Sequence, residues 1–82
     1  MTALVVGADS GLVADELVRM GDEDDVIVLD LSPQRLEALE DQVADARVWF
    51  MIGDAEVIPL PDASVDAVLG APESPEVDRV TR

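Results

Sequence analysis

The feature that most constrains this chain is a pair of short apolar runs, the first ending in a glycine-containing turn and the second ending in an acid. Residues 4–6 (LVV) lead into Gly7 and Gly11, and a helix-like segment follows. Residues 26–29 (VIVL) end at Asp30, which follows Gly11 by 19 residues. A strand, a glycine turn, a helix and an acid-tipped strand, with about 20 residues between turn and acid, are typical of a nucleotide-binding βαβ unit.

Hydrophobic periodicity predicts the other elements. Four short apolar runs are typical of buried strands: residues 2–7, 26–30, 48–52 and 65–69. Two segments have the apolar spacing of helices: residues 11–20 and, with Ser32 as N-cap and Pro33 as first helical residue, 33–44. We expect a loop at residues 53–64, and an irregular tail at 71–82 with at most one helical turn at 75–80.

This order predicts an α/β fold with a parallel sheet of about four strands in the order 3-2-1-4, joined by right-handed crossovers. Both predicted helices then lie on one face of the sheet. Because parallel sheets are normally covered on both faces, we expect a second copy of the chain or a partner protein to cover the other face. The outer edge of the strand at 65–69 has Asp66 as its only charge, which also favours a homodimer or an obligate complex.

The composition narrows the possible chemistry. The 82 residues suffice for one small domain. The chain has no His and no Cys, which excludes a His-based triad, a thiolate nucleophile and the common zinc ligands. No side chain is therefore predicted to be catalytic, and no metal site is expected.

The net charge of −14, with five arginines and no lysine, is extreme for this length. Adaptation to high intracellular salt, where screening weakens self-repulsion, and arginine enrichment by codon bias are both compatible with it. No basic patch exists for nucleic-acid phosphates, so direct nucleic-acid binding is not expected. The chain lacks a basic leader and an apolar run of about 18 residues, which predicts a soluble cytoplasmic protein without a membrane segment.

Three segments resemble the class I S-adenosylmethionine-dependent methyltransferases. Residues 4–11 resemble their first motif, in which a strand enters a Gly-x-Gly-x-Gly turn, and residues 26–33 (VIVLDLSP) resemble their second strand with its ribose-binding acid. The most specific match is residues 53–69 (GDAEVIPLPDASVDAVL), which resemble the family's GDAE-x-LPF-x-D-x-SFD segment. The resemblance implies a Rossmann-like half-domain over residues 1–70.

The resemblance implies a protein that binds S-adenosylmethionine or S-adenosylhomocysteine and lacks its own substrate-binding half. Gly7 and Gly11 would shape the turn beside the methionine part of the cofactor, and Asp30 would accept hydrogen bonds from the ribose hydroxyls.

For the adenine, the resemblance implies that Leu31 packs on the ring, Asp54 accepts from the amino group and the Ala55 N–H addresses the ring. A carboxylate for the diol, an acceptor for the amine and an apolar slot for the ring are what adenosine requires.

Two positions depart from the family pattern. The central glycine of the turn is Asp9, which adds bulk and negative charge and is the one residue able to supply a substitute carboxylate for the cofactor's ammonium group. The acid commonly found two residues before the first glycine is Val5. Asp30 and Asp54 also have purely structural interpretations, as a strand end near Ser32 and as the cap of a turn.

Two alternatives to a cofactor-binding methyltransferase-like domain stay open. The first is a non-enzymatic interaction module that acts through homodimerisation or a partner protein. Residues 2–12 (TALVVGADSGL) also resemble the opening of nicotinamide-dependent short-chain dehydrogenases. Their final turn glycine is replaced by Val13, however, and their Tyr-x-x-x-Lys pair cannot exist in a chain without Tyr and Lys.

Overall fold

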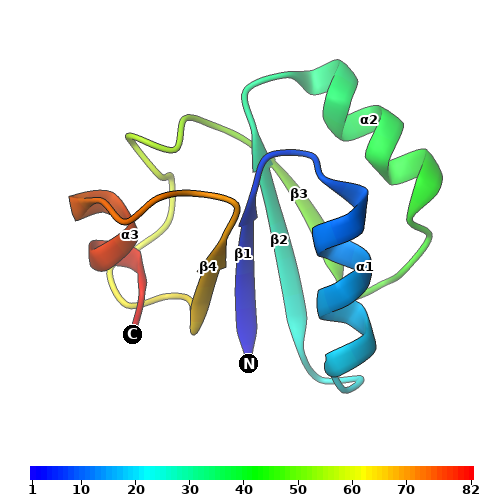
Figure 1. Cartoon of the computed structure of the whole chain (residues 1–82), viewed down its shortest axis with the longest axis horizontal. Helices are drawn as coiled ribbons and strands as arrows, with labels where there is room; N and C mark the ends of the chain where they lie inside the picture. Colours follow the sequence, from blue (N-terminus) through cyan, green and yellow to red (C-terminus); the bar gives the residue numbers. More distant parts are fainter.

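The computed structural model describes residues 1–82 and contains four strands and three helices (Figure 1). In chain order the elements are β1 (Thr2–Val6), α1 (Ser10–Arg19), β2 (Asp25–Asp30), α2 (Pro33–Gln42), β3 (Val48–Ile52), β4 (Ala67–Leu69) and α3 (Pro75–Val80). All strand pairs are parallel, and the sheet order is β3-β2-β1-β4. The predicted α/β fold and strand order are confirmed. None of the three helices has the length and apolar character needed to cross a membrane.

Side-chain caps set where the two long helices begin. The carboxylate of Asp9 accepts hydrogen bonds from the N–H groups of Gly11 and Leu12, so α1 begins one residue earlier than predicted. The hydroxyl of Ser32 accepts from the N–H of Arg35, and proline occupies the first turn of α2, as predicted.

One face of the sheet packs against α1 and α2, which lie together to the right of β1 in Figure 1. This packing forms the larger apolar core, and its buried members come from five elements: Val5, Val13, Val26, Val28, Leu36, Leu39 and Val48. The prediction that both helices share one face is confirmed.

The opposite face is covered in part by the chain itself, which corrects the expectation of an open face. Helix α3 and the long loop that precedes β4 lie on the other side of β1 in Figure 1. Together they supply a second apolar core. Its buried members are Leu4, Leu29, Ile58, Val65 and Val80. Residues 75–80, for which at most one helical turn was expected, form the short helix α3, and Val80 at its end is fully buried in this core.

The fourth strand is shorter than predicted, because Val65 pairs with the C-terminal segment. Only Ala67–Leu69 continue the ladder with β1, and Val65 instead forms a parallel bridge with Thr81. The Val65 carbonyl also accepts from the N–H of Arg82 at 2.9 Å. The chain's own C-terminus therefore pairs with the start of the edge that the sequence predicted to be free.

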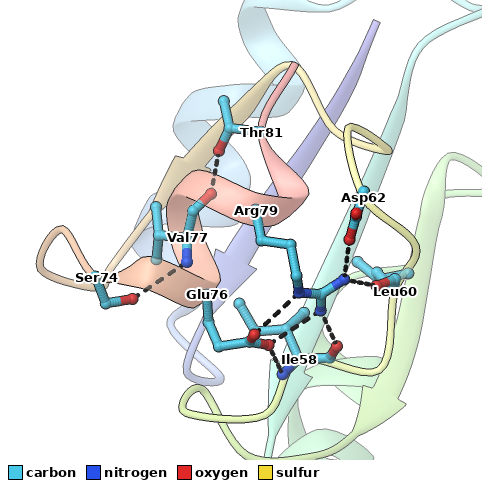
Figure 2. A network of polar contacts seen from close by, with 8 residues as sticks. All are labelled: Ile58, Leu60, Asp62, Ser74, Glu76, Val77, Arg79 and Thr81. Atoms are coloured by element: carbon cyan, nitrogen blue, oxygen red, sulfur yellow. Dashed lines mark hydrogen bonds and ion pairs between the residues drawn. The ribbon is translucent and has the colours of Figure 1, made fainter.

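A polar cluster fixes α3 to the loop before β4 (Figure 2). We define the Arg79 cluster as Ile58, Leu60, Asp62, Glu76 and Arg79. The Arg79 guanidinium donates to the carbonyls of Ile58 and Leu60 and to the carboxylates of Asp62 and Glu76, at 2.8–3.0 Å. The Glu76 carboxylate also accepts from the N–H of Ile58 at 2.8 Å. The bonds from Arg79 and Glu76 to the loop join residues 17–21 positions apart and hold the loop over the sheet.

Apolar side chains remain exposed at the β3 end of the sheet. Trp49 and Ile52 are each 59% exposed, and the Trp49 indole N–H donates to Asp25 at 3.1 Å. A groove of about 430 Å³ lies beside Trp49 and includes Ile27 and Met51. Ile52 lies on the helix face, beside α2, whereas Trp49, Ile27 and Met51 lie on the opposite face, and the chain leaves that part of the opposite face uncovered.

Candidate functional site

A pocket of about 410 Å³ lies at the carboxyl edge of the sheet, where β1, β2 and β3 end. Ligand pockets have volumes of about 300–1,000 Å³, and in open α/β sheets they lie at this edge, beside the point where the strand order reverses. Nine residues line the pocket: Val6, Gly7, Asp30, Leu31, Ser32, Arg35, Gly53, Asp54 and Ala55. Five of the seven residues predicted from the sequence are among them.

Asp30, at the tip of β2, is the most constrained carboxylate of the pocket. Its side chain is only 7% exposed. One oxygen, Oδ2, accepts from the N–H of Ala8 at 2.8 Å, and the other, Oδ1, accepts from the N–H of Ser32 at 2.9 Å. Asp30 therefore ties the turn after β1 to the loop after β2, and both walls of the pocket depend on it.

The charge state of Asp30 follows from these partners. Burial alone would raise the pKa of Asp30, because it removes water from the carboxylate. The N–H donors of Ser32 and Ala8 and the positive charge of Arg35 together outweigh burial and hold the pKa below its ordinary value of 3.8. At neutral pH the side chain is ionised and acts only as an acceptor.

Gly7 forms the turn at the end of β1. Its φ is +97°, a region that side-chain-bearing residues rarely adopt, and a Cβ atom built there would meet no atom within 4 Å. The Gly7 N–H donates to the Leu29 carbonyl at 2.7 Å. The glycine is thus required by the backbone conformation, and it leaves open space beside the turn.

The predicted adenine side consists of Leu31, Asp54 and Ala55. Leu31 is 65% exposed, so an apolar surface is available beside the pocket. Asp54 is exposed, and its Oδ1 accepts from the N–H of Glu56 at 2.8 Å. Asp54 therefore caps the following turn, which is the structural role that the sequence also allowed for it. A carboxylate offers about four lone-pair sites, so this bond leaves it further acceptor capacity.

Asp9 and Gly11 do not line the pocket. The Asp9 carboxylate caps α1 by accepting from the N–H groups of Gly11 and Leu12 at 2.9 and 3.2 Å. This cap is the physical reason for an acid in place of the central turn glycine. Val5 is fully buried in the helix-side core, so it offers no contact to a ligand.

A comparison with protein families settles which kind of domain this is. Residues 3–79 match the family described as a methyltransferase domain. The chain belongs to this family. The resemblance to class I methyltransferases is confirmed, and the alternative resemblance to short-chain dehydrogenases does not identify the family. The methyltransferase domain is also 35% identical over 66 residues to a rice (Oryza sativa subsp. japonica) protein, the chloroplastic 2-methyl-6-phytyl-1,4-hydroquinone methyltransferase 2.

Solved structures share the fold of this methyltransferase domain. It superposes on a SAM-dependent methyltransferase from Aquifex aeolicus with a TM-score of 0.75 and 24% identity, covering 100% of this chain and 51% of that chain. In the complex of the Haloferax volcanii Trm112 methyltransferase activator with a methyltransferase, the match has a TM-score of 0.68 and 27% identity. It covers 82% of this chain and 29% of that chain.

The methyltransferase domain is much shorter than these relatives. The match covers 80% of this chain but 19% of the rice protein. In the part that is shared, no group of three His, Cys, Asp or Glu side chains has an arrangement that holds a metal ion. The side chains of the pocket instead offer hydrogen-bond acceptors and apolar surface, which are the groups that a nucleoside requires.

Two residues that shape this edge were missed by the sequence reasoning. Arg35, in the first turn of α2, lines the pocket with its Nε 3.5 Å from Asp30 Oδ2. Gly70 follows β4 with a φ of +79°, and a Cβ atom there would lie 2.4 Å from the Val6 carbonyl oxygen. A helix that starts three residues after the acid was the signal for Arg35, and a glycine directly after a strand was the signal for Gly70.

Proposed function

We propose that this methyltransferase domain binds the adenosyl part of S-adenosylmethionine and S-adenosylhomocysteine in the pocket at the carboxyl edge. The observation that carries the proposal is the convergence of Gly7, Asp30, Leu31, Asp54 and Ala55, which come from three separate segments, around one pocket. The family resemblance assigns the ribose and the adenine to four of them, Asp30, Leu31, Asp54 and Ala55, and it assigns to Gly7 the turn beside the methionine part.

The hydrogen-bond capacity of Asp30 supports this proposal. An ionised carboxylate has about four lone-pair sites. The N–H groups of Ala8 and Ser32 use one site on each oxygen. A ribose diol requires two acceptors, and both oxygens of Asp30 retain a site for it. The proposed role of Asp30 is to accept from the two hydroxyls while its other lone pairs hold the pocket walls in place.

The residues fit the adenosyl half of the cofactor better than its amino-acid half. Val5 is buried and Asp9 does not line the pocket, so neither is placed to contact an ammonium group there. The cofactor, when bound, supplies a methyl group on a sulfonium. We propose that the groups that bind the methyl acceptor come from polypeptide outside these 82 residues or from a partner protein.

The test of the proposed function is the affinity for S-adenosylhomocysteine by isothermal titration calorimetry, in wild type and in Asp30→Ala. Loss of hydrogen bonds to a charged acceptor weakens binding by about 1–3 kcal/mol, which is about 5- to 150-fold. The control is Asp15→Ala, which removes an exposed carboxylate from α1 and leaves the affinity unchanged. Equal affinities of wild type and Asp30→Ala contradict the proposed ribose contact.

Asp30 also tethers the backbone of Ala8 and Ser32, so a second variant separates binding from folding. Asp54→Ala removes an exposed side chain that bonds only to the adjacent turn. It is expected to weaken binding while the amide spectrum retains its folded dispersion. If both variants bind like wild type, the pocket is not the adenosyl site.

A second candidate function is supported by the apolar groove beside Trp49, which includes Ile27 and Met51. Monomeric proteins rarely leave contiguous apolar surface uncovered, and edge strands such as β3 readily pair with another chain. The related Haloferax volcanii structure is a complex with the Trm112 activator. We propose that this domain binds a protein partner, or a second copy of itself, through the β3 end of the sheet.

Sedimentation-velocity analysis tests this candidate. A dimer that dissociates in Trp49→Ser supports self-association through this surface, and Val18→Ser, on the 85%-exposed position of α1, is the matched control. A wild-type monomer at all concentrations overturns self-association.

A further inference from the structure

Arg35 is a charged residue of the pocket to which the family resemblance assigns no role. It lies in the first turn of α2, three residues after the N-cap Ser32, and its Nε is 3.5 Å from Asp30 Oδ2. Its side chain is 66% exposed, whereas the Asp30 side chain is only 7% exposed. Apart from the two carboxylates, Asp30 and Asp54, it is the only charged group lining the pocket.

The contact places Arg35 in competition with any ligand that uses Asp30. The Ala8 and Ser32 N–H groups each take one lone-pair site, which leaves one on each oxygen. The Nε of Arg35 lies 3.5 Å from Oδ2, so the guanidinium stands beside one of these two oxygens. A diol that engages both oxygens therefore has to compete with the guanidinium.

Displacement of Arg35 is physically easy. A long side chain that is mostly exposed and makes one ionic contact at 3.5 Å is held weakly, because water and salt screen the pair. Asp30 does not depend on this pair for its structural role, since its bonds to Ala8 and Ser32 are shorter and come from the backbone.

We infer that Arg35 is a specificity-determining residue, which competes with the ribose diol for Asp30 and so makes diol binding weaker at low salt and stronger at high salt. The inference rests on the proposed adenosyl site. It assigns to that site a dependence on ionic strength that arises from a single side chain.

The chain contains a closely matched control for Arg35. Arg19, in the last turn of α1, is also 66% exposed and forms an ion pair with Glu16, whose side chain is also 7% exposed. Neither residue lines the pocket. Arg19→Gln therefore makes the same change in net charge and breaks the same kind of ion pair, away from the site.

The experiment compares two probes by amide NMR titration at low and at molar potassium chloride. Adenosine carries the diol, and 2′,3′-dideoxyadenosine lacks it. Since exposed ion pairs contribute about 0.2–1 kcal/mol, Arg35→Gln is expected to bind adenosine about 1.5- to 5-fold more tightly than wild type at low salt. The gain disappears at molar salt, with the dideoxy probe and in Arg19→Gln.

Each other outcome overturns the inference in a recognisable way. Equal or weaker adenosine binding by Arg35→Gln shows that the guanidinium does not compete with the diol. An equal gain for the dideoxy probe shows that Arg35 acts on the pocket through charge or shape, not through the ribose. Absence of binding by every variant with both probes overturns the proposed adenosyl site, and the inference with it.

Discussion

Arg79 and Arg35 both lie beside carboxylates, but the molecule uses them in opposite ways. Arg79 donates to two carboxylates and two backbone carbonyls and is about one-third exposed. Hydrogen bonds to Glu76 and then to Asp62 raise the pKa of Arg79 above its already high ordinary value. Arg35 is twice as exposed and makes one contact, at 3.5 Å.

The difference distinguishes a structural cluster from an adaptable site. In the Arg79 cluster the guanidinium engages every group around it, so the loop before β4 has a defined position over the sheet (Figure 2). At the pocket the backbone alone holds Asp30, and the nearby guanidinium is free to leave. A ligand is therefore expected at the carboxylate whose charged partner is loosely held.

The largest loss of stability is expected from Val80→Ala, which removes apolar contacts between α3 and the second core. Val80 is fully buried at the end of α3, against Leu4 and Leu29 in the second core. Truncation leaves a cavity and is expected to lower the free energy of unfolding by about 2 kcal/mol. Urea unfolding followed by circular dichroism measures it. Val18→Ala, at an 85%-exposed position, is expected to change it by less than about 0.5 kcal/mol. Equal effects would show that α3 does not anchor the fold.

A smaller loss is expected from Arg79→Gln, which tests the comparison directly. The variant leaves the Leu60 carbonyl without its guanidinium donor, the Ile58 carbonyl with only the Leu60 N–H, and Glu76 without its cation. We expect a melting temperature several degrees below that of wild type, whereas Arg35→Gln leaves it within about 2 °C. Differential scanning calorimetry at neutral pH gives both values. Comparable losses would mean that both arginines are structural.

The pH dependence of stability should report Glu76. Hydrogen bonds from Arg79, and then from the Ile58 N–H, hold the pKa of Glu76 below its ordinary value of 4.5. A carboxyl whose pKa is lower in the folded state stabilises the fold above the unfolded pKa, and this stabilisation is lost as the pH falls below 4.5. When the pH is lowered through this range, the melting temperature of Glu76→Gln should therefore fall less than that of wild type. A parallel pH profile for the two proteins would show that Glu76 is not the responsive group.

Local signals explain why much of the fold was predictable. The apolar runs of β1 to β3 and the Ser32-Pro33 start of α2 are encoded within a few residues. Helix α3 was not predicted in full, because Pro72 and Pro75 read as helix breakers. Pro75 in fact occupies the first helical position after the Ser74 cap. Contacts of Arg79 with residues about 20 positions away complete the element, and no local pattern encodes them.

The residues of the candidate site also divide into those that local sequence predicts and those that only the folded structure defines. The spacing of the three motifs predicts that Gly7, Asp30 and Asp54 lie together, since each lies at or just after the end of a parallel strand and such strands end at one edge of the sheet. An Asp that precedes a helix predicts the cap formed by Asp9, but the family resemblance interprets the same position as a replaced glycine. The position of Arg35 depends on how α2 meets β2, which only the folded structure defines.

We propose that the pocket at the carboxyl edge, and not the Arg79 cluster, binds the ligand. A residue-resolved amide NMR titration of the wild-type domain with S-adenosylhomocysteine in molar potassium chloride tests this proposal. We expect chemical-shift changes at Gly7, Ala8, Leu31 and Ala55, with the amides of α3 unchanged. Changes centred on α3, or an unchanged spectrum of a folded sample at saturating ligand, would contradict it.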